Sequence, residues 1–111
     1  MISMFNCEFN YYYMGEKTAH VKIVNGHATT EQFSKEWYRL PFGMVPDHNV
    51  RRETIRIFFE EHCIPKHRKD LQKFLDYYGL EKWDAFKICR ITNGEHAHKY
   101  GFIEWLDKQQ N

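Results

Sequence analysis

Apolar and polar residues alternate over the first third of the chain. Residues 5–13 place an apolar or aromatic side chain at every second position, and the same period of two returns over residues 19–23. Such a period is typical of a strand with one buried face. Asn25 and Gly26 follow directly, and this dipeptide favours a type I′ hairpin turn because both residues tolerate a positive φ. The pattern therefore predicts a β-meander over residues 1–36.

The middle of the chain changes to a helical period. Two sets of residues repeat the spacing i, i+3, i+4 and i+7 of one helix face, namely Ile55, Phe58, Phe59 and His62, and then Leu71, Phe74, Leu75 and Tyr78. Pro65 stands between them; it ends one helix because its ring offers no N–H donor, and its fixed φ suits the first position of the next. Gly79 favours the left-handed conformation found at helix ends. We expect a helical hairpin that turns at Cys63 and Ile64 and whose two apolar faces bury each other.

A third, shorter helix and a closing segment complete the predicted fold. Asp84 can cap this helix, which ends at the turn-forming pair Asn93–Gly94. The helical part then spans residues 47–94, and the apolar run within residues 100–107 predicts a closing strand or turn. We predict a single α+β domain over residues 1–111. Its N-terminal antiparallel sheet of three or four strands packs against the helical hairpin and the third short helix.

Composition narrows the class of protein. Lys and Arg number 16 against 15 Asp and Glu, which leaves a formal net charge of +1. This balance offers no bulk attraction to nucleic acid or to a membrane surface, and it argues against an acidic DNA mimic. The first residues lack the pattern of a signal peptide, and no apolar stretch approaches about 20 residues, so we expect a cytoplasmic protein. Cys7, Cys63 and Cys89 show no paired spacing, which favours reduced thiols used as small apolar residues.

Four stretches of sequence carry a resemblance. They are Leu-Pro-Phe-Gly at 40–43, Ile-Phe-Phe-Glu-Glu-His-Cys-Ile-Pro-Lys-His-Arg at 57–68, Tyr-Gly-Leu at 78–80 and Ile-Thr-Asn-Gly at 91–94. In this order they resemble a family of short, mostly uncharacterised proteins from gut Firmicutes and their mobile elements, some of them encoded beside HipA-like kinases. The resemblance implies a small regulatory or accessory protein of mobile DNA. Through its Pro-x-x-Arg corner it also implies that Arg68 takes part in a buried or interface ion pair.

Four residues have the chemistry of metal ligands. Cys63 and His67 are four positions apart and His96 and His98 two apart, so together they match a tetrahedral zinc site. Against this, Pro65 separates the cysteine from the helix expected to hold His67, and a His-x-His pair equally suits solvent-facing side chains. The chain also has no phosphate-binding glycine loop, no Gly-x-Ser-x-Gly elbow and no His-Glu-x-x-His motif. We therefore expect no cofactor and no enzymatic activity, and keep a small zinc-supported interaction domain as an alternative.

A second alternative is a module that binds nucleic acid. Lys66, Arg68, Lys69 and Lys73 would open the second helix of the hairpin, where the recognition helix of a helix-turn-helix meets the major groove. The near balance of acidic and basic residues instead favours a solvated charged face.

The aromatic residues are the strongest indication of function. Tyr11, Tyr12 and Tyr13 follow one another, which puts aromatic rings on both faces of one strand, so a core on one side does not account for all of them. Trp, Tyr and Arg are enriched among the residues that dominate interface energies. We predict that Tyr11, Tyr12, Tyr13, Trp37 and Arg68 bind a protein partner. The equal alternative is that the aromatic residues fill the core of a small domain.

The predicted function follows from the aromatic residues and the resemblance together. We expect a non-enzymatic protein-binding regulator from phage or mobile DNA that inhibits a bacterial protein stoichiometrically. The expected target is a defence nuclease, as with anti-CRISPR proteins, or a HipA-like kinase.

Overall fold

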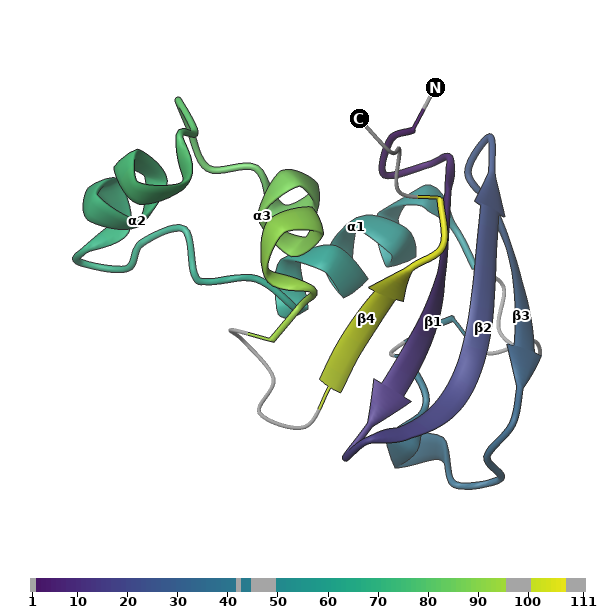
Figure 1. Cartoon of the computed structure of the whole chain (residues 1–111). Helices are drawn as coiled ribbons and strands as arrows, with labels where there is room; N and C mark the ends of the chain where they lie inside the picture. Colours follow the sequence, from purple (N-terminus) through teal and green to yellow (C-terminus); the bar gives the residue numbers. More distant parts are fainter. Residues whose placement is uncertain (1, 42, 45–49, 96–100, 108–111) are drawn as a thin grey trace.

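One antiparallel sheet takes up the first third of the chain and its last strand. The structure is a computed structural model that describes residues 2–41, 43–44, 50–95 and 101–107. In this part of the chain four strands lie in the order β3-β2-β1-β4 (Figure 1). β1 (Cys7–Tyr13), β2 (Glu16–Val24) and β3 (His27–Gln32) form a meander, and β4 (Gly101–Trp105) pairs with β1. The predicted N-terminal sheet is confirmed, and the closing segment supplies its fourth strand.

The turn between β2 and β3 sets the pairing of these strands. Asn25 and Gly26 both have a positive φ, of 51° and 80°, as a type I′ turn requires. Val24 and His27 pair on either side of the turn. Because side chains alternate between the faces of a strand, this register sends Ile23 to the buried face of the sheet.

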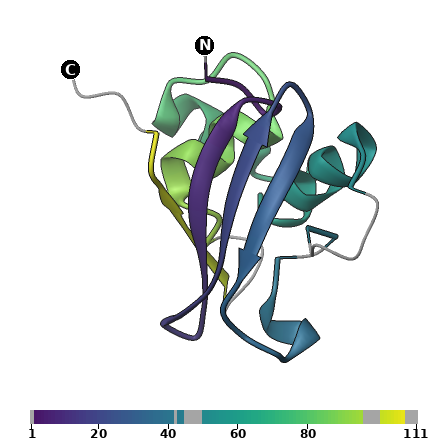
Figure 2. The same ribbon diagram turned by 90° about the vertical axis from the view of Figure 1, so that its right-hand side faces the viewer.

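α1 (Arg52–Glu61) and α3 (Ala85–Thr92) cover one face of the sheet, and the other face carries none of the described helices (Figure 2). The strand side chains that point to the helices are buried: Cys7, Phe9, Tyr11, Val21, Ile23, Ile103 and Trp105. The ring centroid of Phe9 lies 5.6 Å from that of Phe58 and 5.4 Å from that of Trp105. Fully burying one such side chain stabilises a fold by roughly 1.5–3 kcal/mol. This layer forms the core of the predicted α+β domain.

α2 (Leu71–Tyr78) lies to the side of α3 rather than against α1 (Figure 1). The sheet and α3 cover the apolar face of α1 instead, since Phe58 stacks on the sheet and the ring centroid of Phe59 lies 5.2 Å from that of Phe86. The prediction that the apolar faces of α1 and α2 bury each other is therefore wrong. α2 contacts the core through Leu71 and Phe74, which are partly buried.

Residues 62–70 connect α1 to α2 without forming a helix. The prediction that Pro65 opens the second helix is wrong, because α2 begins at Leu71. Residues 66–69 read Lys-His-Arg-Lys, and cationic side chains oppose the positive N-terminal end of the helix dipole. The negative charge of Asp70 suits that end, and the helix begins directly after it.

Three of the predicted helix ends are confirmed. α2 stops at Gly79, which has a φ of 71°. The carboxylate of Asp84 caps α3 by accepting a hydrogen bond from the Lys87 N–H at 3.1 Å. α3 stops at Asn93 and Gly94, with φ values of 57° and 72°. Each end depends on the backbone preferences of a few adjacent residues.

An ion pair that is largely shielded from solvent holds the closing strand to α3. Arg90 Nη1 lies 2.6 Å from Asp107 Oδ1, and the guanidinium carbon lies 4.4 Å from the ring centre of Trp105. The Trp105 indole N–H donates to Cys89 O at 3.2 Å. Asp107 Oδ2 accepts a hydrogen bond from the Glu8 N–H at 2.9 Å. These contacts place β4 against both α3 and β1.

All three cysteines are buried free thiols, as predicted. Burial raises the pKa of Cys7 and that of Cys63 from 9.0 to about 12, and it raises the pKa of Cys89 as well. At neutral pH these side chains therefore pack as small, uncharged groups.

Candidate functional site

Several exposed aromatic side chains belong to the segment that follows β3. This segment passes the end of the sheet where β1 turns into β2 (Figures 1 and 2). Trp37 is 80% exposed, Tyr38 48% and Phe33 46%. The ring centroid of Tyr38 lies 6.2 Å from that of Tyr13 and 6.0 Å from that of Trp37. The ammonium group of Lys17 lies 5.3 Å from the ring centre of Phe33. We call Tyr13, Phe33, Trp37 and Tyr38 the aromatic surface.

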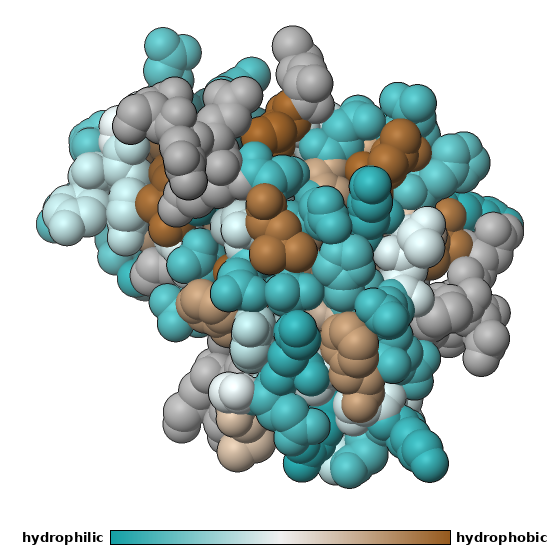
Figure 3. Space-filling view, turned by 45° about the vertical axis from the view of Figure 1, so that its right-hand side comes forward, coloured by the Kyte–Doolittle hydropathy of each residue, from teal (hydrophilic) through white to brown (hydrophobic). Residues whose placement is uncertain are grey.

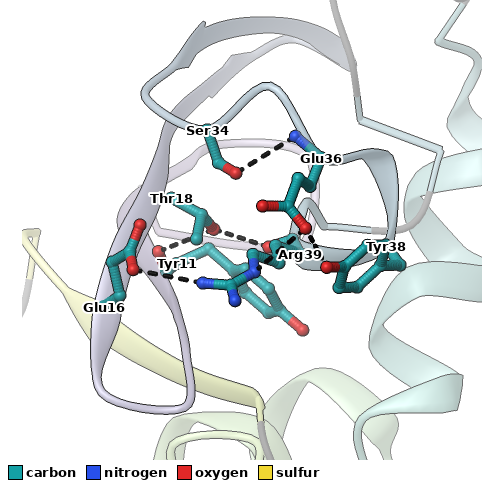
Figure 4. A network of polar contacts seen from close by, with 7 residues as sticks. All are labelled: Tyr11, Glu16, Thr18, Ser34, Glu36, Tyr38 and Arg39. Carbon is teal, nitrogen blue, oxygen red and sulfur yellow. Dashed lines mark hydrogen bonds and ion pairs between the residues drawn. The ribbon is translucent and has the colours of Figure 1, made fainter.

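One arginine links the parts of this surface. Arg39 ends the short 3-10 helix η1 (Trp37–Arg39), and its Nη1 reaches back to β2, 3.1 Å from Glu16 Oε2 (Figure 4). The guanidinium carbon lies 5.8 Å from the ring centre of Tyr38 and 6.0 Å from that of Tyr13. A cation near an aromatic ring is attracted by the ring's electron distribution. Arg39 thus holds two aromatic rings and the start of β2 together.

A buried hydroxyl anchors the backbone of η1. The pairing of β1 with β2 shifts register near the end of β1, and such a bulge redirects a side chain. Thr18 lies at this shift, fully buried, and its Oγ1 donates to Arg39 O at 2.7 Å (Figure 4). The Glu36 carboxylate accepts a hydrogen bond from the Tyr38 hydroxyl and lies 3.7 Å from Arg39 Nε. Contacts from both sides therefore determine the position of η1.

The aromatic surface is presented by an anchored element, yet Trp37 at its tip leaves most of its area in solvent. On the face of the molecule in Figure 3, hydrophobic side chains occur in separate small groups among hydrophilic ones. A few anchored aromatic side chains within polar surroundings match the anatomy of an interface in which a few residues dominate the binding energy.

Tyr11 belongs to the core, which corrects its place in the predicted partner-binding set. It is 4% exposed, and its hydroxyl lies 3.1 Å from Nε2 of the buried His62. The other ring nitrogen, Nδ1, lies 2.9 Å from Phe58 O. A carbonyl only accepts, so in this geometry Nδ1 donates to Phe58 and Nε2 accepts from Tyr11. Burial raises the pKa of Tyr11 to about 12.

Tyr12 and Tyr13 lie in different parts of the molecule, and neither lies in the core with Tyr11. Tyr12 lies on the open face of the sheet, where its hydroxyl donates to Glu104 Oε1 at 3.2 Å and its ring centroid lies 6.0 Å from that of Phe102. Tyr13 and Trp37 both belong to the aromatic surface. The structure therefore brings these two predicted residues together and separates them from Tyr12.

The basic residues predicted to contact nucleic acid do not share a helix. Lys66, Arg68 and Lys69 lie in the connection before α2, whereas Lys73 lies on α2. The prediction of a basic recognition helix is therefore wrong. Arg68 pairs with Asp70, with 3.2 Å between Nη2 and Oδ2, and this hydrogen bonding lowers the pKa of Asp70. The two side chains are 42% and 52% exposed, so the ion pair is not buried.

The predicted zinc ligands lie in different environments. Cys63 is buried, and its thiol donates to Ile64 O at 3.3 Å. Its raised pKa opposes formation of the thiolate that zinc requires. His67 is exposed in the connection, and His96 and His98 lie outside the described residues. Among the residues that the structure describes, no group of three or more His, Cys, Asp or Glu side chains is placed to hold a metal ion.

A depression of about 370 Å³ lies between the C-terminal ends of α2 and α3, and it is lined by Tyr78, Ile91, Thr92, Asn93 and Glu95. The Thr92 hydroxyl donates to Ile88 O at 2.9 Å. Catalysis by a hydroxyl needs a base beside it and donors for the developing charge. Within this lining the hydroxyl is instead engaged by its own helix.

The sequence patterns do not mark Phe33, Tyr38 or Arg39 as site residues. The informative contact is that of Arg39 with Glu16, 23 positions earlier in the chain. A local signal does exist, because an acidic residue and an arginine enclose two adjacent aromatic residues at 36–39. It indicates a functional site only once the fold brings it to the end of the sheet.

No protein-family model, curated protein or solved structure matches the chain. In the described ranges, no helix has the length and apolar character needed to span a bilayer.

Proposed function

We propose that the chain is a non-enzymatic protein-binding regulator that occupies one partner stoichiometrically through the aromatic surface. The observation that carries the proposal is the exposure of Trp37, 80%, on an element anchored by Arg39 and Thr18. Because the backbone that carries Trp37 is already held in place, little backbone entropy is lost on binding, and more of the contact energy appears as affinity. Trp, Tyr and Arg are also the residue types most enriched among interface residues that dominate affinity.

The charges around the aromatic surface support a protein partner. Glu16 and Glu36 lie beside Arg39, and Lys17 and Lys35 are exposed nearby in sequence. A rim of both signs is typical of a protein interface. Nucleic acid would instead require neutralisation of several phosphates, which makes affinity fall steeply with salt. We expect affinity for the partner to change little with ionic strength.

The resemblance to small proteins of mobile elements supports a bacterial target. Within this proposal the partner is a defence nuclease, as with anti-CRISPR proteins, or a HipA-like kinase. In either case inhibition results from covering a surface of the target, so the inhibitor and target act in equal amounts.

Affinity capture from a nuclease-treated bacterial lysate tests the proposal when three baits are compared. They are the unaltered chain, Trp37→Ala, and Tyr77→Ala as a matched control, because Tyr77 on α2 is 81% exposed and lies outside the aromatic surface. We expect one protein to be retained by the first and third baits in near-equal amount and lost with Trp37→Ala. Identical recovery on all three baits contradicts the choice of surface. Recovery that requires intact nucleic acid contradicts the proposed class of partner.

A further inference from the structure

The chain contains the dipeptide Asn-Gly twice, at 25–26 and 93–94. An asparagine before glycine is chemically labile, because glycine has no side chain to shield its amide nitrogen. That nitrogen attacks the side-chain amide carbon of the asparagine; a C–N bond forms, and the side-chain nitrogen leaves as ammonia with the proton of the glycine amide. Water then opens the cyclic imide to aspartate or isoaspartate. Both sites share this chemistry, so backbone conformation and contacts decide whether it proceeds.

Both asparagines hold a backbone conformation that prevents the attack. Asn93 has φ and ψ of 57° and 28°. Asn25 has a φ of 51°, and it occupies the first central position of a type I′ turn, where ψ is about +30°. For an L residue, such a ψ places Cβ and the next amide nitrogen on nearly opposite sides of the Cα–C bond. Ring closure requires them on the same side, so neither asparagine reacts until its backbone rotates.

At the first site the attacking nitrogen is also engaged. The Gly26 N–H donates to Phe5 O at 3.0 Å, and Gly26 is buried. A Cβ added at Gly26 would lie 2.9 Å from Arg52 Nε, so this side chain packs closely over the backbone of the turn. A buried amide proton that is hydrogen-bonded is shielded from base until the structure opens. The nitrogen therefore keeps its proton and does not become the nucleophile.

Residues 5 and 6, which precede β1, hold the turn in this state. Asn6 Oδ1 accepts a hydrogen bond from the Asn25 N–H at 3.0 Å. Arg52 Nη2 donates to Asn25 O at 3.3 Å, and the guanidinium carbon of Arg52 lies 4.6 Å from the ring centre of Phe5. These contacts join the segment before β1, the turn between β2 and β3, and the first residue of α1.

We infer that Asn25 is a modification site whose deamidation is controlled by the contacts of Phe5 and Asn6 with the turn. While the contacts hold, the asparagine stays intact. When residues 5 and 6 leave the turn, Gly26 loses its acceptor and the backbone gains the freedom to rotate. Local openings of this kind require less free energy than global unfolding. The inference does not rest on the proposed function, since these residues lie outside the aromatic surface.

The isoaspartate product makes the opening permanent. In isoaspartate the backbone runs through the side-chain carbonyl, which adds a carbon atom to the chain between β2 and β3. The pairing of Val24 with His27 depends on a turn of two ordinary residues. Because register decides the face to which each strand side chain points, the modified chain loses the native pairing at the start of β3.

Ageing the whole chain at neutral pH, followed by peptide mapping with mass spectrometry, tests the inference. Native protein is compared with protein unfolded in urea, and conversion at each Asn-Gly site is measured separately. We expect both sites to convert at least about tenfold more slowly in native protein, a factor that corresponds to about 1.4 kcal/mol of opening free energy. Hydrogen exchange at the Gly26 amide, followed by NMR, measures the opening of the first site directly.

Asn6→Ala separates local release of the turn from a general loss of stability. This variant lacks the acceptor of the Asn25 N–H, and conversion at Asn25 should be about fivefold faster, the equivalent of about 1 kcal/mol for one hydrogen bond. Asn93, at the end of α3, should convert at its unaltered rate and is the internal control. Asn10→Ala is the matched control variant, because it loses an exposed hydrogen bond to Glu104 instead; both of its sites should convert as in the unaltered chain.

Two results overturn the inference. The first is conversion at Asn25 as fast in native protein as in urea. The second is an Asn6→Ala chain in which Asn25 converts at the unaltered rate or in which both sites accelerate equally. Either form of the second result excludes local control by residues 5 and 6.

Discussion

Replacing Tyr11 with alanine tests the division between core and surface on β1. Tyr11 is 4% exposed, its ring centroid lies 6.0 Å from that of Phe58 and 5.5 Å from that of His62, and its hydroxyl bonds to the His62 ring. Truncating a buried aromatic side chain to alanine costs about 3–5 kcal/mol, since contacts are lost and a cavity remains. A domain of this size has a free energy of unfolding of about 5–15 kcal/mol. We expect Tyr11→Ala to lose a large part of that stability.

Trp37→Ala is the matched comparison, because it removes an even larger aromatic side chain from an 80% exposed position. Surface substitutions usually change stability by no more than about 0.5 kcal/mol. Urea unfolding followed by far-UV circular dichroism measures both variants without relying on tryptophan fluorescence, which Trp37→Ala alters. With a typical urea dependence, Tyr11→Ala should lower the unfolding midpoint by on the order of 2 M. Trp37→Ala should leave the midpoint nearly unchanged.

Tyr11→Phe separates packing from hydrogen bonding. It keeps the ring against Phe58 and removes the hydroxyl bonded to His62, so the loss should be about 1 kcal/mol, the usual net contribution of one hydrogen bond. A midpoint for Tyr11→Ala within about 0.5 M of the unaltered chain refutes the core placement. A loss above about 2 kcal/mol for Trp37→Ala shows that Trp37 supports the fold, contrary to the scale expected of a surface position.

Three further outcomes can be measured. Asp84→Ala should lower the free energy of unfolding by about 1 kcal/mol because α3 loses its cap. Thermal melts measure this loss, with the exposed Glu81→Ala as the control. Equal melting temperatures for the two variants contradict the role of the cap. Gly26→Ala should cost about 1–2 kcal/mol, since its φ of +80° is left-handed, and an unchanged urea midpoint excludes that strain. Stability should fall as pH rises from about 9 to 12, because the unfolded chain releases the protons of Cys7 and Cys63 near 9.0 and the native chain near about 12. Through this window the native state holds more protons, so each thiol contributes a loss of up to about 1.4 kcal/mol per pH unit. In Cys7→Ala the free energy of unfolding, measured by urea titration at several pH values, should fall less steeply with pH. An unchanged dependence on pH contradicts the contribution of Cys7.

Signals that depend on adjacent residues predicted local structure well. The Asn25–Gly26 turn, the Asp84 cap and the Gly79 helix end all match the structure, because each reflects the backbone preferences of a few neighbouring residues. The prediction from Pro65 of where α2 starts was wrong, since the basic residues after the proline oppose a helix N-terminus. The sequence already contained this charge pattern, which explains why the helix starts after Asp70 rather than at the proline.

The candidate site shows where local patterns stop being informative. Three consecutive tyrosines mark β1 as unusual, but a period of two does not decide which face is buried. The fold sends Tyr11 to the core, Tyr12 to the open face and Tyr13 to the aromatic surface. The selection of Trp37 matches its exposure, whereas Arg39 depends on a partner on another strand.

By itself, the sequence determined the α+β class, the order of strands and helices and most of their ends, because periodicity and turn chemistry act over a few residues. Only the tertiary structure decided that β4 returns to pair with β1, that the sheet and α3 cover α1, and that Arg39 meets Glu16. These contacts join residues far apart in the chain. Their formation depends on which buried surfaces fit together, and that choice is made by the packing of the whole domain rather than by any local stretch.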